Sequence, residues 1–150
     1  MNGQPGRLTL ELRCEIPAGR KRVFAALTEA PALATWWGPA GFTTPEIQLD
    51  LRPGGHYRFT MQPPDGTAFH LAGEFLEISP PTLLAYTFRW EEPDPDDRET
   101  IVRLSLESGG DTTQVVLSHG VFATQDRLAL HTRGWSESFE KLRAFVESDQ

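Results

Sequence analysis

The feature that most constrains this chain is a run of period-two alternation between residues 43 and 119. Tyr57 and Phe59 share one parity in this run, as do Phe88 and Trp90 further along. Side chains on alternate positions of a strand point to the same face, so each set places one face of a strand in a core. Turn residues interrupt the alternation about every ten positions, a spacing typical of antiparallel strands joined by short loops. The segment therefore predicts an antiparallel meander.

Different patterns flank this meander. An alternating strand is predicted from Leu8 to Ile16, and two short helices follow it, the second introduced by Pro31. From Thr124 onward, itself a suitable N-cap, apolar residues recur at helical spacing. The apolar stripe of this last helix is Leu128, Trp135, Phe139, Leu142 and Val146. This order predicts an α+β fold in which a curved antiparallel sheet wraps one long C-terminal helix.

Three local expectations follow from the same patterns. In a long strand of the meander the apolar parity changes near Glu74, which predicts a β-bulge that turns Leu76 toward the core. Leu51 is expected to share the inward face of the first meander strand. Glu137 and Lys141 lie about one helical turn apart and are expected to pair.

Length and composition indicate one globular unit. A chain of 150 residues is long enough to bury about 70% of the surface that its unfolded form would expose. We expect a flexible N-terminus over residues 1–7 and a single domain over residues 8–150. The lone Cys14 cannot form an intramolecular disulfide, and the first residues lack the pattern of a signal peptide. We therefore expect a cytoplasmic location.

The charge of the chain bears on its partners. The net charge is -7 and the isoelectric point is about 5.0. Nucleic acids and anionic membranes are bound chiefly through Lys and Arg side chains. No apolar run is long enough to span a bilayer. We expect neither nucleic acid nor a membrane as partner.

A set of short motifs, in order along the chain, resembles one known family. The motifs are Val23-Phe24 with Ala26-Leu27-Thr28, Trp36-Trp37-Gly38-Pro39 with Gly41-Phe42, Arg52-Pro53-Gly54-Gly55, Met61 with Pro64-Asp65-Gly66, Gly73-Glu74 with Glu77-Ile78 and Pro80-Pro81, Leu117-Ser118-His119, and Gly134-Trp135. With the order of elements they resemble the START-like (SRPBCC) superfamily and, within it, the activator of heat-shock protein 90 ATPase homologue-like family. The resemblance runs from about residue 8 to residue 147.

The resemblance implies a helix-grip (START/Bet v-like) fold. It also implies a cavity between the sheet and the last helix, which in relatives receives lipids, polyketides, hormones or other apolar molecules. Members of such a fold differ in what they do, so the resemblance implies the fold more firmly than the function.

We expect a ligand pocket lined by aromatic and aliphatic side chains with two histidines as polar fixing points. The residues are Trp37, Tyr57, Phe59, Phe88, Leu104, His119, Leu128, His131 and Trp135. Aromatic-rich walls with few polar groups are typical of small-molecule pockets. The alternative for a buried histidine is a structural hydrogen bond. Gly134, unfavourable inside a helix, has two explanations, which are close approach to the sheet and room for a ligand.

Three functions are compatible with the sequence. The leading hypothesis is binding of a small, mostly apolar ligand, without a cofactor. The second is a co-chaperone-like interaction module that regulates a chaperone ATPase, with a protein partner or as a homodimer. The third is an enzyme of the cyclase, hydrolase or dehalogenase kind that uses His119 with a carboxylate such as Glu74.

No catalytic residue and no metal ligand is assigned. Ser118 and His119 are neighbours on a predicted strand, so they point to opposite faces and cannot act as nucleophile and base. The four histidines lack the His-x-x-His or Glu-x-x-His spacing that preorganises a metal site, and one cysteine cannot form a thiolate cluster.

Overall fold

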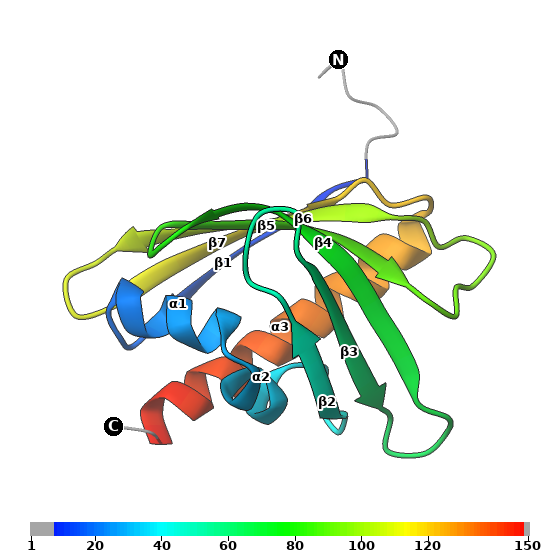
Figure 1. Ribbon diagram of the computed structural model, residues 1–150, viewed down its shortest axis with the longest axis horizontal. Coiled ribbons are helices and arrows are strands. Elements are labelled where there is room, and N and C mark those ends of the chain that lie inside the picture. Colours follow the sequence, from blue (N-terminus) through cyan, green and yellow to red (C-terminus); the bar gives the residue numbers. More distant parts are fainter. Residues whose placement is uncertain (1–7, 149–150) are drawn as a thin grey trace, which may run out of the picture.

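The computed structural model describes residues 8–148 (Figure 1). Residues 1–7, where we expect a flexible N-terminus, lie outside the described residues, as do residues 149–150. In chain order the elements are β1 (Leu10–Ile16), α1 (Arg20–Thr28), α2 (Ala30–Trp36), β2 (Thr43–Leu49), β3 (His56–Gln62), β4 (Phe69–Ser79), β5 (Leu83–Trp90), β6 (Thr100–Ser108), β7 (Thr113–Gly120) and α3 (Gln125–Ser148).

The strands form one antiparallel sheet in the order β1-β7-β6-β5-β4-β3-β2. From β2 to β7 each strand pairs with the next one in the chain, so the predicted meander is confirmed. The first strand lies beside the last, with Leu10 opposite His119 and Ile16 opposite Thr113. This pairing places β1 and β2 at the two edges of the sheet.

The sheet curves over α3, and β2, β3 and the first part of β4 bend down past the helix in Figure 1. The stripe residues Trp135, Phe139, Leu142 and Val146 are buried, and Leu128 is half-buried against the core. The two short helices α1 and α2 contact the same helix. The α+β helix-grip fold predicted from the sequence is therefore confirmed.

The alternating positions of the strands supply the rest of the core. Tyr57, Phe59, Phe88, Leu104 and His119 are all buried on the face that meets α3. Burying a large apolar side chain contributes about 1.5–3 kcal/mol, so these strand faces and the α3 stripe dominate the stability of the fold.

The bulge predicted in β4 is confirmed, but one of its consequences is wrong. Phe75 pairs with Tyr86 and Glu77 with Ala85, which leaves Leu76 as the extra residue. Leu76 is 44% exposed, because the extra residue of a bulge lies outside the ladder, and Ile78 is turned inward instead. The inward position expected for Leu51 is wrong as well, since this residue follows the end of β2 and is 40% exposed.

The N-terminus of α3 is capped as predicted. The Arg127 N–H donates to Oγ1 of Thr124 at 3.1 Å, and the Thr124 hydroxyl donates to Asp96 Oδ2 at 2.9 Å. The Arg127 guanidinium also lies 2.8 Å from Asp97 and 3.2 Å from Asp94. These contacts fix the connection between β5 and β6 against the start of α3.

None of the helices within residues 8–148 is both long and apolar enough to cross a membrane.

We predict that Thr124→Ala lowers the free energy of unfolding by about 1–2 kcal/mol, because the helix loses its cap and Asp96 loses a donor. Urea denaturation followed by circular dichroism measures the change. The matched control is Thr35→Ala, an exposed position in α2 whose hydroxyl donates to Pro31 O, with an expected change within about 0.5 kcal/mol. Equal losses in both variants would contradict the role given to the cap.

Candidate functional site

An apolar pocket of about 420 Å³ opens between α3, the inner face of β3–β5 and the loop that follows α2. Its walls are largely aromatic, formed by Trp37, Phe42, Phe69, Phe88, Trp90 and Trp135. At the rim lie Leu130, which is 54% exposed, and the ion pair between Arg133 and Glu137 at 3.3 Å. The volume lies in the lower half of the range of about 300–1,000 Å³ that is typical of small-molecule pockets.

Contacts between aromatic rings hold these walls. The rings of Trp37 and Trp135 meet edge to face with centroids 5.3 Å apart. The Phe69 ring lies 5.2 Å from Trp90 and 6.1 Å from Phe42. Such pairs contribute about 0.5–1.5 kcal/mol each beyond their burial and so stabilise the walls.

The loop over residues 38–42 forms one side of the pocket and is held by α3. Lys141 Nζ donates to three carbonyl oxygens of this loop, at 3.1–3.3 Å. Glu137 Oε1 accepts the Ala40 N–H at 3.1 Å, and this bond is the main reason that the pKa of Glu137 is lowered. Within the described residues Glu137 and Lys141 make no direct ion pair, because both side chains bind the loop and Glu137 pairs with Arg133. Their opposite charges still interact, since Lys141 contributes to the lowered pKa of Glu137.

A hydrogen-bond chain links α3 to the sheet behind the pocket. Trp135 Nε1 lies 2.9 Å from His119 Nδ1, and an indole nitrogen can only donate, so Nδ1 accepts. The proton of the neutral His119 ring therefore lies on Nε2, which donates to Oγ1 of Thr100 at 2.8 Å. The Thr100 hydroxyl donates onward to Phe88 O at 3.3 Å. The chain connects α3, β7, β6 and β5.

The second histidine is fixed in the same way. Trp90 Nε1 donates to His131 Nε2 at 3.1 Å, so the proton of that ring lies on Nδ1 and is donated to Arg127 O at 2.7 Å. Burial lowers the pKa of His131, partly opposed by this bond to Arg127 O. Burial, with a smaller effect of His131, lowers the pKa of His119 well below its usual value. Both rings are neutral, and every ring nitrogen has a partner.

The structure divides the nine residues expected to line a pocket into two groups. Those that line the apolar pocket are Trp37, Phe88, His131 and Trp135. Those that lie in or against the core, away from its walls, are Tyr57, Phe59, Leu104, His119 and Leu128. Tyr57 donates its hydroxyl to Thr87 O at 2.6 Å and borders a separate hollow on the outer face of the sheet.

Several pocket residues were not among the predicted ones. Met61 shares the parity of Phe59, and Trp90 that of Phe88, so both were expected on the inner face, but parity alone did not place them in the pocket wall. Gly134 faces the pocket, and an added Cβ there would meet only Pro39 Cγ, at 3.7 Å. A close approach of α3 to the sheet therefore does not explain the glycine at this position.

The catalytic pair considered from the sequence is not brought together. Glu74 is exposed on the outer face of the sheet, where it pairs with His56, whereas His119 is fully buried on the inner face. Strand alternation on β4 turns Glu74 away from the core, because its neighbour Phe75 faces inward. A mechanism that uses these two residues as a pair is wrong.

The structure also brings together three side chains that could bind a metal. Ligand atoms of His70, Glu91 and Glu92 lie within 4.8 Å of one another. Arg58, however, donates to both carboxylate oxygens of Glu91, at 2.9–3.1 Å, and His70 Nδ1 lies 2.7 Å from Glu92. The cluster is accounted for by these two pairs.

Comparisons with known proteins agree with this architecture. Residues 17–147 match the family described as Activator of Hsp90 ATPase homolog 1-like protein. The fold is similar to that of protein CV1439 from Chromobacterium violaceum, with 24% identity and a TM-score of 0.83 over 93% of this chain and 97% of that one.

Two further solved structures are similar over almost the whole chain. Protein NE0264 from Nitrosomonas europaea shares 25% identity, with a TM-score of 0.81 over 95% of this chain and 96% of that one. The AHSA1 (SPO3351) protein from Silicibacter pomeroyi shares 27% identity, with a TM-score of 0.81 over 95% and 99%. No curated protein matches the chain at a significant level.

We predict that the free energy of unfolding falls as the pH is lowered below about 6.5, the usual pKa of an unfolded histidine. The folded pKa values of His119 and His131 are lowered, so the unfolded chain takes up their protons first. Each histidine contributes up to about 1.4 kcal/mol per pH unit between its unfolded and folded pKa values. Urea denaturation at pH 7.5, about 6.5 and about 5.5 measures the dependence.

The variant His119→Asn should lose about half of this pH dependence, because one of the two buried rings is gone. The control is His56→Asn, an exposed position on the outer face, which should keep the full dependence. A wild-type stability that is constant over this pH range would show that the two rings are not held neutral.

Proposed function

Since the chain belongs to the Activator of Hsp90 ATPase homolog 1-like family, we propose that it is a binding module that holds a small, mostly apolar ligand in the pocket between α3, β3–β5 and the loop 38–42. Membership of this family is compatible with a ligand-binding or a chaperone-related module. The observation that favours the first is a preformed pocket with six aromatic residues in its walls.

The polar groups of the pocket support an apolar ligand. Both nitrogens of His131 are already hydrogen-bonded, so this side chain offers a ligand its ring face and edge but no free donor or acceptor. The Ser138 hydroxyl lines the pocket and makes no hydrogen bond to another described residue. A ligand with one polar group can use Ser138, whereas further buried polar groups would remain unpaired at a cost of about 1–3 kcal/mol each.

Space for the ligand comes from Gly134. The absence of a side chain there leaves the middle of α3 open toward Pro39, on the opposite side of the pocket. A glycine inside a helix lowers its stability by about 1 kcal/mol relative to alanine. At this position the absence of a side chain leaves open volume in the pocket. The function therefore depends on the shape of this helix face.

We predict that a screen of lipids, aromatic metabolites and polyketides by thermal shift and native mass spectrometry finds a compound that stabilises the protein. A ligand at one hundred times its Kd adds about 2.7 kcal/mol to the free energy of unfolding. In Gly134→Leu the new side chain occupies the part of the pocket between α3 and Pro39, so both the bound mass and the thermal shift should be strongly reduced.

The matched control is Ser136→Leu, an exposed position on the same helix that does not line the pocket and should bind as the wild type does. The proposal fails if no compound in the three classes binds, or if Gly134→Leu binds as tightly as Ser136→Leu.

A further inference from the structure

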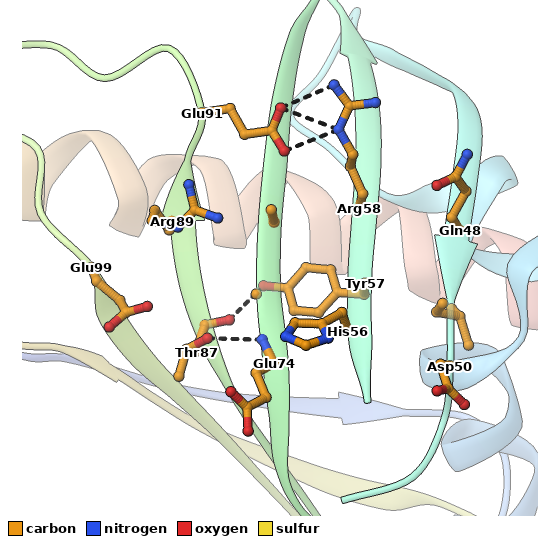
Figure 2. Close-up of a pocket in the computed structure, with 13 residues that line it drawn as sticks. Gln48, Asp50, His56, Tyr57, Arg58, Glu74, Thr87, Arg89, Glu91 and Glu99 are labelled. Atoms are coloured by element: carbon orange, nitrogen blue, oxygen red, sulfur yellow. Dashed lines mark hydrogen bonds and ion pairs between the residues drawn. The ribbon is translucent and has the colours of Figure 1, made fainter. Parts of the chain in front are cut away.

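The outer face of the sheet carries a second hollow, of about 640 Å³ (Figure 2). In Figure 2 α3 lies behind the strands, so this hollow opens on the face opposite the helix. Its lining includes the small residue Ala72 and many charged side chains. The charged residues are Asp50, Arg58, Glu74, Arg89, Glu91 and Glu99.

Some of these charges are already paired. Arg58 donates to both oxygens of Glu91, and Asp50 accepts from Arg52 at 2.7 Å. The charged groups of Arg89 and Glu74 make no ion pair or hydrogen bond to any side chain within residues 8–148. A guanidinium and a carboxylate thus face one hollow, both available to a ligand.

The strand register sets the separation between Arg89 and Glu74. Ala72 pairs with Arg58 on one side and with Arg89 on the other, so the small residue lies between two arginines. Glu74 follows two positions along β4 and pairs with His56. Two residues of a strand span about 7 Å. Figure 2 accordingly shows the arginines toward one end of the hollow and Glu74 with His56 toward the other.

The charge balance excludes a simple anion as the preferred ligand. The lining carries two arginines and four carboxylates, and the charge of Glu91 is paired with that of Arg58. A ligand with a negative group alone would be attracted by Arg89 and repelled by Glu74 and Glu99. A ligand that carries both signs, separated along β4, meets a favourable charge at each end.

We propose that this outer hollow binds a zwitterion of dipeptide length. Its carboxylate lies over Ala72 and accepts hydrogen bonds from the planar guanidinium of Arg89, while its ammonium group donates to the Glu74 carboxylate. An extended dipeptide spans at most about 7 Å, which matches the backbone spacing between Ala72, opposite Arg89, and Glu74 along β4. In a single amino acid the two charges are adjacent and cannot reach both ends.

The test is a titration of the ¹⁵N-labelled protein with glycylglycine at low salt, followed by amide chemical shifts. Shifts should concentrate on β3, β4 and β5 around Ala72. The N-acetylated and the C-amidated dipeptide each lack one charge. Each should bind about tenfold more weakly, because each loses one charge-assisted hydrogen bond. Glycine should bind weakly as well.

Variants assign the two ends. Arg89→Gln and Glu74→Gln should each weaken glycylglycine binding about tenfold. The double variant with Arg89→Glu and Glu74→Arg should recover part of the affinity, because the dipeptide can bind in the reversed orientation. The control Arg103→Gln changes an exposed arginine that pairs with Glu77 and does not line the hollow, and it should bind as the wild type does.

Three outcomes would overturn the proposal. They are the absence of shifts at about 10 mM glycylglycine, equal binding of the capped dipeptides, and affinity that is unchanged in both Arg89→Gln and Glu74→Gln. Amide spectra of each variant without ligand show whether it is folded, so a loss of binding is not confused with unfolding.

Discussion

The hydrogen bond from Trp135 Nε1 to His119 Nδ1 joins the middle of α3 to the sheet, and the geometry of the pocket depends on it. A buried indole N–H without an acceptor would cost about 1–3 kcal/mol, so this bond restricts how α3 can rotate about its axis. With Trp135 directed at the sheet, Gly134 and Ser138 face the pocket. Lys141, further along the helix, then reaches the carbonyl oxygens of the loop 38–42.

The same hydrogen bonds limit the chemistry of the inner site. His119 and His131 resemble candidate bases in the sequence, but each accepts an indole N–H on one nitrogen and donates from the other. A general base needs a free lone pair that can reach the proton it takes. These rings therefore act in the structure as connectors between helix and sheet, and the site is suited to recognition by shape.

Much of the fold followed from periodicity, whereas the site did so only in part. Parity assigns a side chain to a face, so Phe59, Leu104 and Phe88 were correctly expected to point inward. Parity does not tell where along a strand the packed core ends and an open space begins, and only Phe88 of these three lines the pocket. Helical spacing likewise predicted a direct pair between Glu137 and Lys141. Local spacing carries no information on the loop 38–42, about one hundred residues earlier in the chain, which binds both side chains.

The most direct test of the pocket is a crystal structure of the protein under xenon pressure, since apolar cavities bind xenon without the need for a cognate ligand. We expect xenon density between Trp37, Phe88 and Trp135, beside Gly134. Side chains packed to normal density in that space, with no xenon bound, would contradict the account of an open apolar site between the sheet and α3.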